Sequence, residues 1–212
     1  MKKLLILFIA LLLFACSENT NDPADNLTFE SNQDAGLILA VETNFELGSY
    51  TETMFQLYKN ELLEILSDMF EVEKEKMQDM TMSEIIEVYG EDWQISAMKE
   101  AAEGHYKEIR VLTDDSCTGV NLMNTITEFA QKGYYIDMVF SLHASSEKTI
   151  SFLDRSYNIV EFTSFLKKNN YYIRSLYQTC CFGSYFFGDW KNAGMYALNG
   201  SVKVNDINIW YC

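Results

Sequence analysis

Short apolar runs alternate with amphipathic stretches along most of this chain, and the alternation constrains its fold more than any other feature. The helical stretches have apolar residues spaced three or four apart, whereas the apolar runs have the length of buried strands. Such alternation predicts an α/β fold, with a mostly parallel sheet and helices on both faces. The expected strands are 37–41, 109–112, 134–142, 149–153, 172–178 and 195–198, and the expected helices are 55–69, 83–89, 93–105, 120–130, 159–166 and 185–193.

The N-terminus has the organisation of an export signal. Lys2 and Lys3 precede an apolar run over 4–15, which is shorter than the roughly 20 residues of a membrane-spanning helix. The run ends in the sequence LFAC at Cys16, which resembles the bacterial lipobox. This resemblance implies a signal peptide over 1–15 and a lipid on Cys16 that anchors the chain in the bacterial cell envelope, on the non-cytoplasmic side. An ordinary signal peptide with a chance cysteine, or a buried helix, is the alternative.

Two further segments follow the expected signal peptide. Residues 16–34 are rich in Asn, Asp, Ser and Glu and contain the only proline, Pro23, which predicts a flexible tether. Residues 35–212 have the size and apolar content of a single domain.

The charge balance excludes two classes of partner. Without Lys2 and Lys3 the chain has 14 basic and 31 acidic residues, a net charge of −17. This charge repels nucleic acid and anionic lipid head groups, so membrane contact is expected through the N-terminal lipid only. The chain has two histidines and no Cys-x-x-Cys sequence, so we expect neither a metal site nor a cofactor.

Two residues capable of nucleophilic catalysis follow expected strands. His143 comes after the strand 134–142, and Cys181 after the strand 172–178. One helix separates these strands, so a right-handed crossover would make them neighbours in the sheet. A thiol and an imidazole at adjacent strand ends can share a crevice, where the imidazole moves the protons of acyl transfer.

The order of strand, His, hairpin, helix, strand and Cys resembles clan CD of the cysteine peptidases, which includes the caspases, clostripain and the gingipains. The matching pieces are residues 136–144 (IDMVFSLHA), 176–183 (LYQTCCFG), 189–194 (DWKNAG) and 199–201 (NGS). The resemblance spans roughly 109–205. It implies a caspase-like three-layer α/β/α sandwich and a cysteine-type endopeptidase acting on peptides or proteins.

The resemblance also implies roles for individual residues. Cys181 would be the nucleophile, because Gly183 stands where the family has Cys-x-Gly. His143 would be the general acid and base, and the backbone N–H groups of Ala144 and Cys181 would form the oxyanion hole. Cys180 is expected to be a small core residue.

Two departures from the family pattern support an alternative. The family's His-Gly is His143-Ala144 here, and the sequence stops at Cys212, where family members commonly continue. The alternative is a catalytically inactive caspase-like lipoprotein that serves as a surface binding module. His105 is expected at the surface, and Cys117 and Cys212 could pair in an oxidising compartment.

Overall fold

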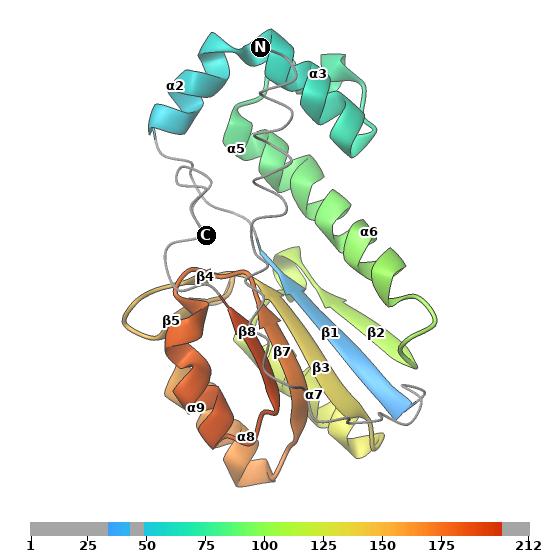
Figure 1. Ribbon diagram of the computed structural model, residues 1–212, viewed down its shortest axis with the longest axis vertical. Helices are drawn as coiled ribbons and strands as arrows, with labels where there is room; N and C mark the ends of the chain where they lie inside the picture. Colours follow the sequence, from blue (N-terminus) through green and yellow to red (C-terminus); the bar gives the residue numbers. More distant parts are fainter. Residues whose placement is uncertain (1–33, 43–48, 201–212) are drawn as a thin grey trace, which may run out of the picture.

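A five-stranded, all-parallel sheet is the centre of the molecule (Figure 1). The computed structural model describes residues 34–42 and 49–200. The strand order is β2-β1-β3-β7-β8, so the first strand in the chain lies near the middle of the sheet. The bounds are β1 Ala35–Val41, β2 Glu108–Leu112, β3 Tyr135–Ser141, β7 Ile173–Gln178 and β8 Ala197–Gly200.

Helices cover both faces of this sheet, as the alternating pattern predicted. One face packs Ile38, Met138 and Leu176 into the largest core of the described residues, together with apolar residues of α7 and α8. The other face packs Leu37 and Leu39 against α6. Every residue of β1 is buried, which explains its uninterrupted apolar sequence. The covering helices are α6 Glu91–Ala102, α7 Gly119–Gln131, α8 Ile159–Asn169 and α9 Phe187–Asn192.

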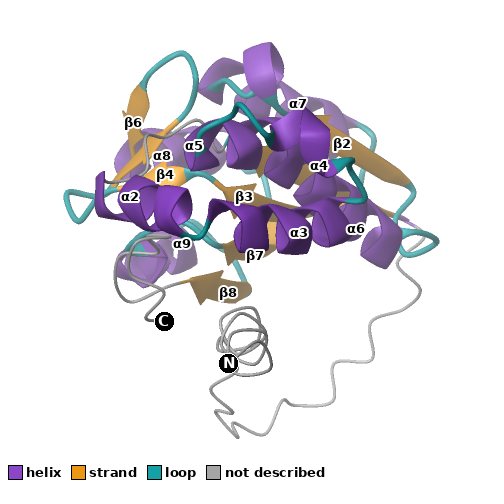
Figure 2. Cartoon of the chain, turned by 90° about the horizontal axis from the view of Figure 1, so that it is seen from above, coloured by secondary structure: helices purple, strands orange, loops and turns teal. Residues whose placement is uncertain are grey.

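The segment between β1 and β2 contains a helical insertion, residues 49–103, most of which lies beyond the carboxyl ends of the strands (Figures 1 and 2). Its first helices enclose a small core of their own, built on residues such as Phe55 and Leu63. The Glu52 carboxylate accepts hydrogen bonds from the N–H groups of Met82 (3.1 Å) and Ser83 (2.9 Å), which joins the first helix of the insertion to the helix that begins at Met82. These helices are α2 Ser49–Leu57, α3 Lys59–Phe70, α4 Lys74–Met77 and α5 Met82–Ile85.

The prediction of two separate helices over 83–89 and 93–105 was wrong. The helix α5 continues without a break through the π-helix η2, Ile86–Gly90, into α6. Gly90 does not interrupt the helix because it adopts ordinary right-handed angles, φ −69° and ψ −37°. The expected single helix over 55–69 is instead divided at Tyr58, whose φ of −117° is not helical.

A small antiparallel sheet follows β3. Its strands are β4 His143–Ala144, β5 Thr149–Ser151 and β6 Ser156–Asn158, with β5 in the middle. The expected strand over 149–153 is therefore the centre of three strands. Ile150 and Phe152 anchor this hairpin because both are buried in the main core.

The last described strand begins two residues later than predicted. Residues 195–198 were expected as a strand, whereas β8 spans Ala197–Gly200. Met195 is buried, which produced the apolar signal, but its N–H donates to the carbonyl of Trp190 and closes the end of α9.

The expected signal peptide over 1–15, the lipid-bearing Cys16, all of the tether except Asp34, and Cys212 lie outside the described residues. Within residues 34–42 and 49–200, the structure contains no helix with the length and apolar character needed to cross a bilayer.

Candidate thiol and imidazole site

The two strands that precede His143 and Cys181 are neighbours. The strands β3 and β7 pair in parallel, with Phe140 opposite Gln178. His143 therefore lies two residues beyond the end of β3, and Cys181 three residues beyond the end of β7. The adjacency predicted from the right-handed crossover is confirmed, and both residues follow the carboxyl edge of the sheet.

The carbonyl of Phe140 links the end of β3 to the end of β7 through hydrogen bonds. It accepts hydrogen bonds from the N–H (2.9 Å) and the hydroxyl (3.3 Å) of Thr179. Because Thr179 is two residues before Cys181, this contact ties the start of the cysteine segment to the strand that leads to His143.

His143 begins the antiparallel hairpin and pairs with Ser151. The residue is partly buried, and its Nε2 atom is shielded from solvent. Burial lowers the pKa of His143 below its ordinary value, because a charged imidazolium loses hydration there. The neutral ring, which can accept a proton, is therefore the favoured form near neutral pH.

Cys180 and Cys181 are adjacent in sequence but lie in different environments. Cys180 is only 1% exposed, and burial raises its pKa to about 12, so it stays protonated and inert. Its expected place in the core is confirmed. Cys181 is partly exposed, and its sulfur forms no disulfide within the described part of the chain. Of the two cysteines, Cys181 is the more exposed to solvent.

Cys117 is the third thiol of the described residues. It is fully buried, and burial raises its pKa to about 12, with a further contribution from the charges of Glu42 and Glu91. Cys212, with which it could pair in an oxidising compartment, lies outside the described residues.

A buried glutamine organises the segment that carries Cys181. The Nε2 of Gln178 donates to the carbonyl of Gly183 (3.3 Å), and its Oε1 accepts from the indole N–H of Trp190 (3.2 Å). These bonds hold the segment and α9 against the end of β7. Sequence reasoning did not single out Gln178, although an amide at the end of a buried strand was a usable signal.

The chain turns sharply after Cys181 and passes close to the end of β8. Phe182 adopts left-handed angles, with φ 54°, and opens a 3-10 helix over Gly183–Phe186. A Cβ on Gly200 would lie 2.9 Å from the carbonyl carbon of Gly183 and 3.0 Å from the nitrogen of Ser184. Only glycine at position 200 allows this backbone contact.

Ala144 occupies a position that suits a backbone donor. It pairs with Ile150, whereas the N–H of the next residue, Ser145, donates to the carbonyl of Thr149 (3.0 Å). Hydrogen-bonded and non-hydrogen-bonded pairs alternate in antiparallel ladders, so the N–H of Ala144 points away from β5. Ala144 is not among the described residues with positive φ, so its backbone does not need glycine.

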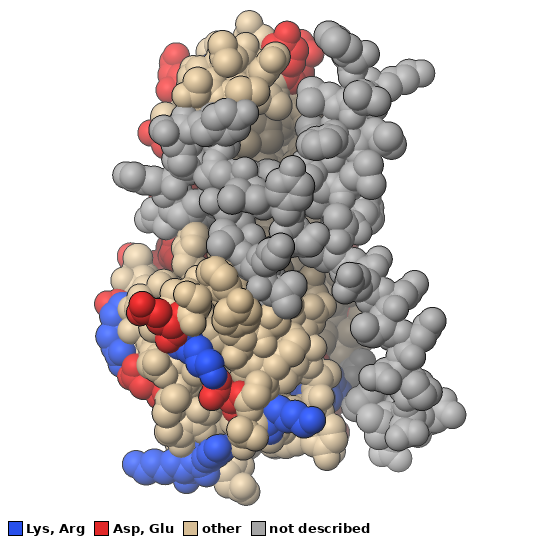
Figure 3. Space-filling model, turned by 60° about the vertical axis from the view of Figure 1, so that its left-hand side comes forward, with Lys and Arg blue, Asp and Glu red and all other residues tan. Residues whose placement is uncertain are grey.

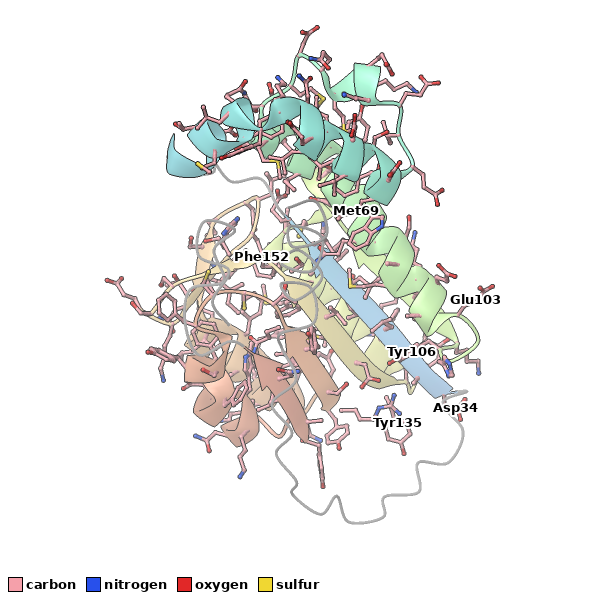
Figure 4. All side chains as sticks on the ribbon, turned by 45° about the horizontal axis from the view of Figure 1, so that its top comes forward. Asp34, Met69, Glu103, Tyr106, Tyr135 and Phe152 are labelled. Atoms are coloured by element: carbon pink, nitrogen blue, oxygen red, sulfur yellow. The ribbon has the colours of Figure 1, made fainter. Side chains whose placement is uncertain are left out.

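A second charged cluster lies away from this site, toward the amino end of the sheet. Asp137 is buried and accepts hydrogen bonds from Arg174, from Ser175 (2.7 Å) and from the hydroxyl of Tyr106 (2.9 Å). A register shift between β3 and β7 places Arg174 and Ser175 together opposite Asp137. Tyr106 lies near that end of the sheet, whereas Phe152 lies near the carboxyl end (Figure 4). The cluster is structural, because it is fully satisfied and remote from His143.

No residues of the described chain form a metal site: no group of three or more His, Cys, Asp or Glu side chains within 34–42 and 49–200 could hold an ion. His105 is exposed, as expected.

The fold and the site together define a class, an α/β protein with a thiol and an imidazole beyond neighbouring strands of a parallel sheet. Searches against protein-family models, curated proteins and solved structures found no significant match.

Proposed function

We propose that this chain is a cysteine-type endopeptidase of the caspase-like kind, anchored in the bacterial cell envelope by a lipid on Cys16. The observation that carries the proposal is the pairing of β3 with β7, because it brings the segments of His143 and Cys181 to one edge of the sheet. Two details add support: the exposure of Cys181 beside an inert Cys180, and a neutral imidazole at position 143.

The proposed reaction begins when the Cys181 sulfur attacks the carbonyl carbon of a peptide bond, as His143 accepts the thiol proton. The N–H groups of Ala144 and Cys181 would stabilise the resulting oxyanion, and the orientation of the Ala144 N–H away from β5 supports that role. The C–N bond then breaks, and His143 passes its proton to the leaving amine. Water, deprotonated by His143, hydrolyses the thioester and restores the free thiol.

The charge of the carboxyl edge favours a cationic substrate. The charges of Glu42, Glu91 and Asp154 contribute to the raised pKa of the Cys117 thiol, so these carboxylates lie near that thiol. Nearby negative charge attracts Lys or Arg side chains more than Asp or Asn. Fluorogenic peptides that end in Arg, Lys, Asp or Asn would rank these choices.

A first experiment is alkylation of the full-length chain with iodoacetamide, with the labelled cysteines identified by mass spectrometry. We expect Cys181 to react fastest, and His143→Ala to slow it by at least about tenfold, within the range of general-base effects. His105→Ala and Cys180→Ala are matched controls that should leave the rate unchanged. Equal, slow labelling of all the thiols would contradict the proposal.

The same experiment has a pH arm. Because burial lowers the pKa of His143, the neutral base persists to lower pH than in a solvent-exposed histidine. We therefore expect the His143-dependent part of the labelling rate to fall away only below pH 6.5, the ordinary value for histidine. A midpoint above 6.5 would mean that the imidazolium is stabilised instead.

A second candidate function is a catalytically inactive caspase-like module that binds a partner at the envelope surface. The shielding of the His143 Nε2 atom from solvent favours it, because a catalytic imidazole must reach its substrate. Peptide turnover that is lost in Cys181→Ala would exclude this second function.

A further inference from the structure

An ion pair joins the hairpin that begins with His143 to the helix that follows Cys181. The Lys148 Nζ atom donates to Oδ2 of Asp189 at 2.7 Å. Lys148 lies in the turn between β4 and β5, and Asp189 lies in the first turn of α9. The two residues are 41 positions apart in sequence, so this contact exists only in the folded chain.

The backbone of Lys148 is fixed on two sides. Its N–H donates to the carbonyl of Ser145 (3.1 Å), and its own carbonyl accepts from the N–H of Ile159 (2.9 Å), the first residue of α8. Its φ of 61° places it in the left-handed region, which closes the turn tightly. The side chain therefore starts from a defined point and reaches across to α9.

Asp189 is fixed as well, because its neighbour Trp190 anchors α9 in the core. Trp190 is 1% exposed, its ring centroid lies 6.5 Å from that of Phe140, and its indole N–H donates to Gln178. The helix α9 is thus held from inside by Trp190 and from outside by Asp189.

The hairpin needs such a connection. The strands β4, β5 and β6 form a sheet separate from the main one, and no backbone ladder joins the two sheets in the described residues. The hairpin is joined to β3 through Leu142, and the N–H of Leu153 donates to the carbonyl of Cys117 (3.0 Å). Side-chain contacts complete the placement of the hairpin relative to the segment of Cys181. Buried Ile150 and Phe152 hold its inner side, and the Lys148–Asp189 pair is on its outer side.

We propose that Lys148 and Asp189 are positioning residues, an ionic clasp that keeps the imidazole of His143 aligned with the thiol of Cys181. This inference rests on the proposed function, and it adds the requirement that the Lys148–Asp189 pair be intact. Neither residue touches the reacting atoms. The pair is half open to solvent, with side-chain exposures of 47% and 25%, and such pairs contribute little to folding stability. Loss of the clasp should therefore affect reactivity far more than stability.

The test measures how much His143 accelerates the alkylation of Cys181. For each variant, the alkylation rate with His143 present is divided by the rate of the same variant carrying His143→Ala, and this ratio is called the His143-dependent acceleration. We expect Lys148→Met and Asp189→Asn to reduce this ratio about tenfold, because small misplacements of catalytic groups are costly. Both should also remove the part of the labelling profile that depends on the protonation of His143. The melting temperature should stay within about 2 °C of wild type.

Three further variants separate the clasp from a general effect of charge removal. Lys148→Arg keeps the charge and should keep the acceleration. Lys148→Asp combined with Asp189→Lys reverses the pair and should restore most of it, since Asp tolerates the left-handed angles of position 148. Arg155→Met is the matched control: it breaks another ion pair of the same hairpin, Arg155–Glu161 at 2.7 Å, and should change nothing.

The outcomes distinguish this inference from the proposed function. If wild type itself shows no acceleration by His143, the peptidase proposal fails, and the clasp fails with it. If wild type shows the acceleration and Lys148→Met and Asp189→Asn retain it, the clasp alone is overturned. An equal loss in Arg155→Met would also overturn the clasp, because the effect would then belong to any charge on the hairpin.

Discussion

The helical insertion and the rest of the described chain use charge in opposite ways. Residues 49–103 contain 14 Asp or Glu and four Lys, a net charge of −10, whereas residues 104–200 contain nine acidic and nine basic residues and are neutral. Residues 34–42 add Asp34 and Glu42, which flank the uncharged strand β1. On the face drawn in Figure 3, Lys and Arg side chains gather over the lower part of the molecule, and the charged groups visible at its upper end are acidic.

The pairing of these charges differs as well. Around the sheet, acidic and basic groups bridge different elements: Arg110 and Lys132 both contact Glu108 and Glu128 at 2.6–3.2 Å. In the insertion, the ion pairs among described residues are longer, such as Lys74 with Glu64 at 3.8 Å. Charge around the sheet is balanced and pairs across elements, while the net charge of the insertion creates a negative field beyond the strand ends.

The largest expected effect is on the free energy of unfolding, and it tests whether the ion pair of Arg174 with Asp137 stabilises the fold. Arg174→Ala leaves the buried Asp137 carboxylate without its main counter-charge, which should lower the free energy of unfolding by about 3–5 kcal/mol. Lys74→Ala, which breaks a partly exposed pair of the insertion, should lower it by less than about 1 kcal/mol. Urea denaturation measures both. Equal losses would remove the contrast between the two regions.

An intermediate effect would test the packing behind Cys181. Gly200→Ala places a methyl group against the backbone of Gly183 and should cost about 1–3 kcal/mol of stability. Gly188→Ala is its control, because a Cβ there meets nothing within 4 Å. Thermal unfolding and the rate of Cys181 alkylation give the two readouts. If Gly200→Ala matched Gly188→Ala in both, the close approach of β8 would have no consequence for the site.

The smallest effect concerns the field of the insertion. A cationic methanethiosulfonate should label Cys181 several-fold faster than an anionic one at about 10 mM salt, and the ratio should approach one at about 0.5 M. Neutralising exposed acids of α3, by Glu61→Gln, Glu64→Gln and Asp68→Asn, should reduce the ratio at low salt. Neutral iodoacetamide is the reference reagent. A ratio unaffected by the triple variant would place the source of the field elsewhere.

The sequence allowed the sheet and the position of the site to be predicted, because both depend on local patterns. Buried strands are recognisable as apolar runs, and the right-handed crossover then makes β3 and β7 neighbours. The difference between Cys180 and Cys181 was only partly predictable: the choice of Cys181 came from a motif, whereas its exposure is a property of the fold.

The features that could not be predicted depend on distant contacts. Gly90 does not end a helix, since tertiary packing overrides its weak propensity. The partners Lys148 and Asp189 carry no periodic signal that links them, and neither do Arg174 and Asp137. Asp137 alone offered a hint, because a carboxylate inside an apolar strand requires a counter-charge.

The π-helix between α5 and α6 sets the direction in which the insertion faces. Each residue of a helix turns the chain by about 100°, so one residue added to a single turn rotates everything beyond it. Ile85, before this turn, packs into the small core of the insertion, while Ile95, after it, packs on the sheet. The number of residues between Ile85 and Ile95 therefore determines the rotation of the insertion about the helix axis. This rotation sets the direction in which the negative surface of the insertion faces relative to the strand ends.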